Sequence, residues 1–162
     1  MKIRYLYIFF LTIISGCIST KPPFPDVLDV WLRDGLMFLN LQVNNKKGVF
    51  LVDTGAGVSF VDINQAGRYE FSVLNNQNMG SIQGIGGSSS FLVTSNLKVK
   101  YEGLDYKGFK FYATNMNSVN SYFRKRNMLI LGILGADFLA KSGAMIDYRK
   151  EQITLGFSEE AL

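Results

Sequence analysis

Apolar and polar residues alternate in short runs along most of this chain, a pattern that predicts β-strands joined by turns rather than long helices. Leu36–Val43 alternates, Asn44–Gly48 has the residues of a turn, and Val49–Val52 is continuously apolar, as expected of a strand buried on both faces. Further strands and hairpins are predicted from the same two patterns over Val58–Val61, Ser81–Val93, Leu97–Tyr101, Phe109–Phe111, Met128–Leu134 and Ala144–Leu155.

Signals for helices are few and are confined to short segments. Asp62 can cap a short helix over Ile63–Gly67, and Gly135–Ala140 can form another helix that Gly143 ends. The segment Thr114–Asn127 is polar and rich in asparagine, which predicts a long loop. Short strands, glycine-rich turns and little helix together predict an all-β fold.

Residues 1–16 are typical of a secretory signal peptide, because a basic head with Lys2 and Arg4 precedes the apolar run Tyr5–Ile14. This run is too short for a membrane-spanning helix, which needs about 20 residues. The sequence Ile14-Ser15-Gly16-Cys17 resembles a bacterial lipobox, which implies cleavage before Cys17 and lipidation of its sulfur. A free or buried cysteine after an ordinary signal peptide is the alternative.

Residues 17–30 are predicted to form a tether, since all three prolines of the chain lie between Ile18 and Pro25. We expect the lipid to anchor the protein to a membrane of the bacterial cell envelope. The residue after the cysteine is Ile18 and not an acidic residue, which by the habit of lipoproteins favours the outer membrane. Residues 31–162 are expected to form one folded domain, because no second linker or internal repeat follows.

Composition narrows the chemistry that a domain of this size can carry. The 162 residues include no histidine and one cysteine, which excludes His-dependent triads, His-ligated metals and disulfide frameworks. The chain has 17 Lys and Arg against 13 Asp and Glu, and removal of residues 1–16 takes away two cations, leaving 15 − 13 = +2. This small net positive charge gives no reason to expect nucleic acid as a partner. We expect no metal and no organic cofactor.

One segment combines the features of an acid–base site. Asp53 follows the buried strand Val49–Val52 and begins the turn Asp53-Thr54-Gly55-Ala56. Strand packing would position the carboxyl group, Gly55 would let the backbone approach it, and the Thr54 hydroxyl can both donate and accept a hydrogen bond. The alternative is an ordinary Asx turn, which is common where Asp and Gly follow a strand.

Two motifs in this order resemble those of the retropepsin-like aspartic proteases. Asp53-Thr54-Gly55-Ala56 is similar to their active-site motif, and Ile133-Leu134-Gly135 is similar to their second signature, which precedes a short helix. Ala136-Asp137-Phe138-Leu139 continues this signature as in bacterial members. The resemblance implies a small closed acid-protease β-barrel with one short C-terminal helix, and an endopeptidase that needs no cofactor.

The resemblance also implies a mechanism, in which two facing aspartates share one proton and activate a water that attacks the peptide bond. The chain has one copy of the motif, and Asp137 and Asp147 are expected to have structural and turn roles. We therefore predict a two-fold homodimer in which each protomer contributes Asp53 and in which Thr54 braces the opposite loop. The substrate would be a peptide or a protein.

The hairpin tip Gly84-Ile85-Gly86-Gly87 resembles the flap that closes over substrate in this family, with a plain mobile turn as the alternative. The absence of a second Asp-Thr-Gly-Ala motif from this sequence also leaves a second hypothesis open. In that hypothesis the same barrel is a non-catalytic envelope lipoprotein that serves for binding or assembly.

Overall fold

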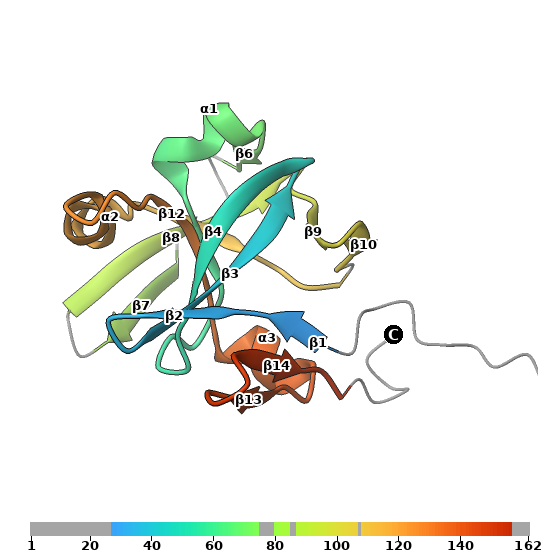
Figure 1. Ribbon diagram of the computed structural model, residues 1–162. Coiled ribbons are helices and arrows are strands. Elements are labelled where there is room, and N and C mark those ends of the chain that lie inside the picture. Colours follow the sequence, from blue (N-terminus) through green and yellow to red (C-terminus); the bar gives the residue numbers. More distant parts are fainter. Residues whose placement is uncertain (1–26, 75–79, 85–86, 107, 157–162) are drawn as a thin grey trace, which may run out of the picture.

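Strands make up most of the structure, a computed structural model in which residues 27–74, 80–84, 87–106 and 108–156 are described (Figure 1). The prediction of an all-β fold is confirmed, while closure of the sheet into a barrel stays a prediction. The strands are β1 (Val27–Asp29), β2 (Trp31–Arg33), β3 (Leu36–Val43), β4 (Lys46–Val52), β5 (Phe60–Asp62), β6 (Ser72–Val73), β7 (Gly80–Gly84), β8 (Gly87–Ser95), β9 (Val99–Tyr101), β10 (Leu104–Asp105), β11 (Tyr112–Thr114), β12 (Ile130–Leu134), β13 (Met145–Asp147) and β14 (Gln152–Thr154). The helices are α1 (Ala66–Tyr69), which follows a 3-10 turn at Ile63–Gln65, α2 (Asn117–Arg124) and α3 (Ala136–Lys141).

The described strands form two sheets. The larger sheet has the order β10-β9-β3-β4-β12-β5-β11-β8-β6, with β2 paired to β3 and β7 paired to β8. At its centre β12 is parallel to β4 and antiparallel to β5, so segments far apart in the sequence become neighbours. The smaller sheet has the order β1-β14-β13 and lies beside α3 (Figure 1).

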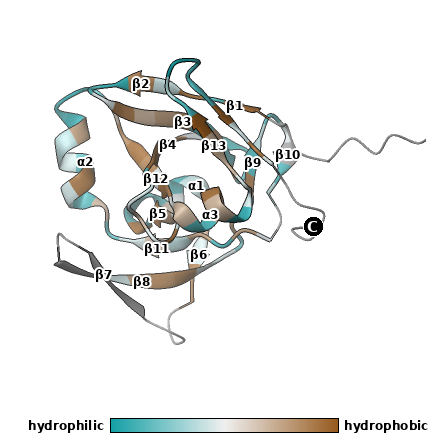
Figure 2. Cartoon of the chain, turned by 90° about the horizontal axis from the view of Figure 1, so that it is seen from below, coloured by the Kyte–Doolittle hydropathy of each residue, from teal (hydrophilic) through white to brown (hydrophobic). Residues whose placement is uncertain are grey.

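The core explains why the strand predictions succeed along the centre of the larger sheet. The predicted strand Leu36–Val43 is β3, and its residues Met37, Leu39, Leu41 and Val43 are all buried. Figure 2 shows hydrophobic residues concentrated on the central strands, while the turns at the periphery are hydrophilic. Burial of this apolar surface supplies most of the favourable free energy of folding.

The predicted loop Thr114–Asn127 is wrong in its middle, where the chain forms α2. The polar composition concealed the helix because its buried face includes an asparagine. Asn120 is fully buried, donates its Nδ2 to the Ile130 carbonyl at 3.0 Å and accepts the Ile130 backbone N–H at 2.8 Å. Phe123 supplies the apolar contact, with its ring centroid 5.6 Å from that of Phe38. The helix is therefore held by side-chain partners that composition does not reveal.

The structure also differs from expectation in a predicted strand that is absent and in a strand that lies inside the predicted tether. Phe109–Phe111 is not a strand, since β11 begins only at Tyr112 and the Phe109 ring instead packs 4.6 Å from that of Phe138. Val27–Asp29 lie within the predicted tether, residues 17–30, yet they form β1 and pair with β14. The predicted helix over Ile63–Gly67 is confirmed as the 3-10 turn with α1, and the predicted helix after Gly135 is confirmed as α3, so α2 is the helix that was not expected.

The predicted signal peptide and Cys17 lie outside the described residues and stay predictions. In the described ranges, no helix has both the length and the apolar character that crossing a membrane requires.

Asp62 has the predicted capping role and is also the centre of a buried polar cluster. Its side chain is 1% exposed and accepts the Asn64 backbone N–H at 3.1 Å, the Met116 backbone N–H at 3.3 Å and the Asn120 side-chain amide at 2.9 Å. Among the described residues these donors are neutral amides, and Gln65 adds another at 3.3 Å. Neutral donors thus compensate a buried carboxyl group without an ion pair.

Asp147 has the predicted turn role between β13 and β14. Its carboxylate accepts the backbone N–H groups of Lys150 at 3.0 Å and of Arg149 at 2.9 Å. These hydrogen bonds, led by that from Lys150, lower the pKa of the Asp147 carboxyl below its ordinary value. Asp147 is thus committed to the turn.

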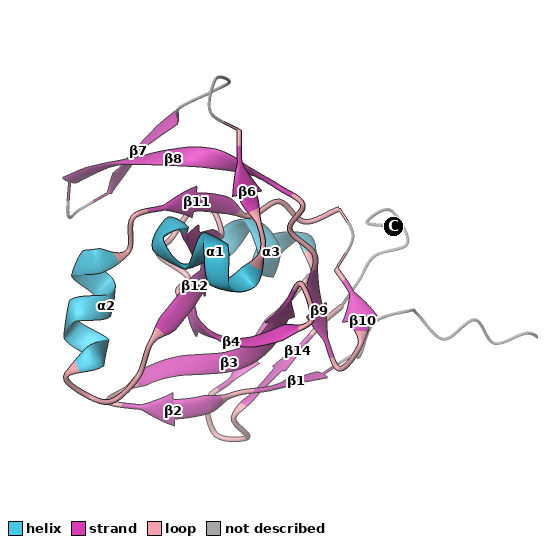
Figure 3. Cartoon of the chain, turned by 90° about the horizontal axis from the view of Figure 1, so that it is seen from above, coloured by secondary structure: helices cyan, strands magenta, loops and turns pink. Residues whose placement is uncertain are grey.

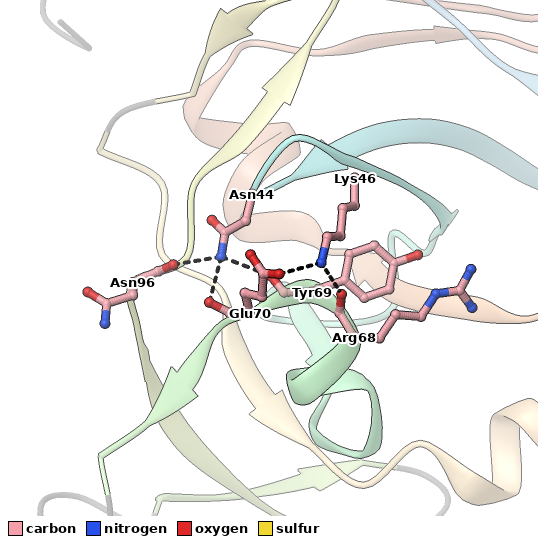
Figure 4. Close-up of polar contacts among 6 residues, drawn as sticks. All are labelled: Asn44, Lys46, Arg68, Tyr69, Glu70 and Asn96. Atoms are coloured by element: carbon pink, nitrogen blue, oxygen red, sulfur yellow. Dashed lines mark hydrogen bonds and ion pairs between the residues drawn. The ribbon is translucent and has the colours of Figure 1, made fainter.

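A polar cluster around Asn44 joins the β3–β4 turn to α1 and to the segment before β9 (Figure 4). The Asn44 amide donates to the carbonyls of Tyr69 at 2.9 Å, Glu70 at 3.0 Å and Asn96 at 2.8 Å, and its oxygen accepts the Lys98 N–H at 2.9 Å. One side chain therefore supplies hydrogen-bond partners to backbone groups at the end of α1 and in the segment before β9, two segments that are not paired with each other as strands.

We expect Asn44→Gly to lower the free energy of unfolding by about 2 to 3 kcal/mol, because several backbone groups lose their partner. Glycine keeps the positive φ of 47° at this position, so the change isolates the side chain. Asn45→Gly is the matched control, since Asn45 has φ 66° and its exposed side chain makes no hydrogen bond to a described residue. Urea unfolding that shows equal losses for both variants would contradict the assignment.

Candidate active site

Asp53 lies immediately after β4, where the sheet gives way to a tight loop. Its backbone N–H donates to the Leu134 carbonyl at 3.0 Å, which extends the pairing of β4 with β12 by one residue. The half-buried carboxyl group accepts the Gly55 N–H through Oδ1 at 2.9 Å. Its second oxygen, Oδ2, makes no hydrogen bond to a described residue. The chain thus fixes one carboxyl oxygen and leaves the other available.

The loop after Asp53 presents its residues to the outside. Thr54 and Gly55 are exposed and Ala56 is half-buried. The Ala56 N–H donates to the Asp53 carbonyl at 3.2 Å, which closes the turn. The Asx turn that was the alternative to a catalytic role is therefore present. It uses one oxygen of the Asp53 carboxyl group and leaves the group at an accessible position.

The second motif lies directly against this loop. Ile133 and Leu134 of β12 are the register partners of Leu51 and Val52 of β4. Two residues after Leu134, the Ala136 N–H donates to the Ala56 carbonyl at 2.7 Å, so α3 starts on the loop itself. The two sequence motifs are therefore one structural unit.

Gly135 permits this contact because no side chain would fit there. A Cβ at Gly135 would lie 2.6 Å from the Val58 carbonyl oxygen and 2.8 Å from that of Ala56. Both neighbours are backbone atoms of the loop, which cannot move aside as a flexible side chain could. A glycine at this place is thus needed for the loop to keep its position.

Ser59 is a site residue that the sequence analysis missed. It is 1% exposed, accepts the Gly135 N–H at 2.9 Å and donates its hydroxyl to Asp137 Oδ1 at 2.7 Å. Asp137 Oδ1 also accepts the Phe138 N–H at 2.8 Å, which confirms the structural role expected of Asp137. A serine between an acidic motif and an apolar strand carries no signal of its own, so only the fold reveals this bridge.

The predicted flap is partly described. Gly84 of β7 and Gly87 of β8 are register partners at the end of the hairpin, while Ile85 and Gly86 lie outside the described residues. β8 pairs with β11, which places the hairpin along one side of the larger sheet (Figure 3). The predicted hairpin is confirmed, and its movement over a substrate stays a prediction.

A row of half-buried apolar side chains lies next to the Asp53 loop. Leu51, Ile133 and Phe60 are register partners on the adjacent strands β4, β12 and β5, so their side chains share one face of the sheet. Phe91 of β8 extends the row, with its ring centroid 6.3 Å from Phe60 and 4.8 Å from Tyr112. Leu51 lies on β4 two residues before Asp53, so this apolar face lies next to the carboxyl group.

The described residues offer no ready metal site, since they contain no group of three or more acidic or cysteine side chains able to hold an ion. The carboxyl group of Asp53 and the apolar row are thus the chemical features of the site. Asp62 and Asp137 are engaged in their own hydrogen bonds and supply no second free acid beside Asp53.

Comparison with known proteins agrees with this geometry. The family model described as aspartyl protease matches residues 39–138, and the chain belongs to this family. Comparison with the curated proteins gives no match.

Solved structures show the same fold. EIAV protease complexed with an inhibitor is similar with a TM-score of 0.52 and 20% identity, over 72% of this chain and 97% of that one. The retroviral protease-like domain of Ddi1 from Leishmania major is similar with a TM-score of 0.50 and 20% identity, over 74% and 87% of the two chains. The fold of this chain is therefore retropepsin-like.

We expect Ser59→Ala to destabilise the protein by about 2 kcal/mol, because it removes a hydrogen bond to a carboxylate and leaves the buried Gly135 N–H without a partner. Ser72→Ala is the matched control, since Ser72 is exposed on β6 and its hydroxyl bonds to no described residue. Thermal unfolding measures the difference, and equal midpoints for the two variants would show that the bridge contributes nothing.

Proposed function

We propose that this protein is an aspartic endopeptidase that works as a homodimer, with Asp53 of each protomer at the reacting centre. The observation that carries the proposal is the placement of Asp53 on the loop that the second family motif supports. Its Oδ1 is fixed by the Gly55 N–H while Oδ2 is unengaged by described residues. This is the arrangement that a carboxyl group needs to bind and orient a water.

The chemistry requires a second carboxyl group close to the first. Two adjacent carboxylates resist double ionisation, so such a pair holds one proton. The ionised member accepts a proton from the bound water, the water oxygen attacks the peptide carbonyl carbon, and the protonated member donates a hydrogen bond to the carbonyl oxygen. The carboxyl group that took the proton from water then gives it to the amide nitrogen, the C–N bond breaks, and the amine leaves. We expect activity to be highest in mildly acidic solution, where the pair keeps its single proton.

A two-fold dimer is the simplest source of the second carboxyl group, because an isologous interface brings equal residues together at its axis. β13 forms one edge of the smaller sheet and pairs with no described strand on its outer side. Met145 on this edge is 68% exposed, and Tyr148 just after it is 57% exposed. Large apolar side chains on an open edge favour pairing with another copy of the chain. Thr54 would brace the opposite loop in this dimer.

The cellular setting of the proposed enzyme is the bacterial envelope. The lipobox-like sequence ending at Cys17 supports a lipid anchor, and the region before Val27 would connect that anchor to β1. The substrate would then be a peptide or protein that reaches the membrane surface.

Asp53→Asn tests the catalytic proposal. We expect it to reduce cleavage of a mixed peptide library by a factor of about 10² to 10⁴, because the amide cannot accept the proton of water. Asp105→Asn is the matched control, since Asp105 lies on β10 and its side chain makes no hydrogen bond to a described residue. Undiminished cleavage by the Asp53 variant would leave the non-catalytic binding lipoprotein as the better hypothesis.

Met145→Glu tests the proposed interface. Two glutamates facing each other across the axis repel, so we expect dimer dissociation to become at least about tenfold easier. Specific activity should fall at low protein concentration and recover at high concentration. Leu74→Glu is the matched control, since Leu74 is an apolar residue 47% exposed and lies next to β6. Sedimentation that shows the unmodified protein to be a monomer at every concentration would remove the dimeric mechanism.

A further inference from the structure

A pocket of about 390 Å³ lies along one edge of β3, away from the Asp53 loop. Its volume is within the range of sites that bind small molecules. No residue of the loop or of the second motif contributes to its lining. The lining consists of Asp29 from β1, Val30 from the link to β2, Trp31 from β2, Asn40, Leu41 and Gln42 from β3, Lys47 from β4, and Lys100, Tyr101 and Glu102 from β9 and the turn that follows it.

The pocket exists because two strands share one edge of β3 without meeting. β2 pairs with β3 only as far as Phe38, and β9 pairs with it only from Gln42 onward. Between them, Leu39–Leu41 have β4 on one side and no described strand on the other. The sheet therefore has a gap about three residues long at this edge.

Asn40 presents backbone hydrogen-bonding groups to this gap. The N–H and C=O groups of successive strand residues point to opposite edges, and the Asn44 N–H points toward β9, where it donates to the Lys98 carbonyl at 3.0 Å. Asn40 lies an even number of residues before Asn44, so its N–H and C=O point to the same edge. A donor and an acceptor in the spacing of a strand are thus available to a ligand.

Two lysines form a positive side of the pocket. Gln42 is the register partner of Lys47 on β4 and of Lys100 on β9, so the two lysines flank it on adjacent strands. Their strands lie on either side of β3, so their backbones are two strand spacings, or about 10 Å, apart, and the long side chains of both lysines can converge on one anion. Neither lysine forms an ion pair with a described residue.

Two acidic residues, Asp29 and Glu102, line the other side of the pocket, and Asp29 Oδ1 also accepts the Gln152 side-chain amide at 3.5 Å. The Asp29 N–H donates to the Tyr101 hydroxyl oxygen at 2.9 Å, and Glu102 is the next residue after Tyr101. Burial raises the pKa of the Tyr101 hydroxyl, and the negative charges of Asp29 and Glu102 raise it further. The pocket is therefore polarised, with cations beside Gln42 and anions around Tyr101.

We propose that this pocket binds a small zwitterion of the amino-acid or dipeptide class. The ligand carboxylate would pair with Lys47 and Lys100, and its ammonium group with Asp29 and Glu102. A peptide N–H and C=O of the ligand would pair with Asn40 as a short strand does, which is recognition by strand addition. This site is separate from Asp53 and does not depend on hydrolysis there.

Trp31 gives a direct readout, since it is the only tryptophan of the chain and lines the pocket. The full-length protein carrying Asp53→Asn is titrated with glycyl-leucine, so that the probe is not consumed. We expect a saturable change in tryptophan fluorescence and a shift of the Asn40 amide resonance. N-acetyl-glycyl-leucine amide, which lacks both charges, should bind at least about tenfold more weakly.

Lys100→Met separates specific binding from general effects. We expect it to weaken glycyl-leucine binding about tenfold, because a carboxylate loses a charged partner. Lys125→Met is the matched control, since Lys125 is an exposed lysine at the end of α2 and outside the pocket, and it should leave binding unchanged. The proposal is overturned by an absent or unsaturable response to glycyl-leucine, by equal binding of the blocked peptide, or by equal binding to the Lys100 variant and its control.

Discussion

The parallel pairing of β4 with β12 is the constraint on which the arrangement around Asp53 depends. It joins Leu51 to Ile133 and Val52 to Leu134, and the Asp53 N–H continues it at 3.0 Å from the Leu134 carbonyl. Closing a long loop to form such a pair costs conformational entropy, which grows slowly with loop length. The burial of both strands in the apolar core offsets this cost. The position of the acidic group is thus a property of the whole sheet rather than of the four-residue motif.

Close approach of backbones makes the pairing possible. Gly132 lies against the Phe50 ring and the Phe60 carbonyl, and Gly135 against the loop, so that a Cβ at either glycine would collide with its neighbours. The polar groups that this close packing buries are each given a partner. Ser59 accepts the Gly135 N–H, and Asn120 serves both backbone groups of Ile130 at the start of β12. Leaving one of these buried groups without a partner would lower the stability of the fold by more than the hydrogen bond itself contributes.

The sequence allowed prediction of those parts of the fold that repeat a simple pattern. β3 alternates over Leu39–Val43, the second half of β4, Val49–Val52, is continuously apolar, and the loop after it has the residues of a tight turn, so the fold class and the place of Asp53 follow from local order. α2 and the Ser59 bridge could not be predicted in this way. Asn120 and Ser59 are ordinary polar residues. No local pattern in the sequence links Asn120 to Ile130, and Ser59 lies 78 residues from Asp137. Their roles arise from tertiary contacts, which composition and periodicity do not encode.

α3 links the proposed reacting centre to the proposed interface. It begins on the loop through the Ala136–Ala56 hydrogen bond and ends at Lys141, and residues 142–144 connect it to β13. Gly143 has φ +57° and lies against the Gly156 carbonyl, while the Gly156 N–H donates to the Ser142 carbonyl at 2.9 Å. This packing leaves little freedom between the helix and the smaller sheet. An interface formed along β13 would therefore fix the distance from the two-fold axis to Asp53, so the geometry of the paired carboxyl groups would follow from the dimer without further adjustment.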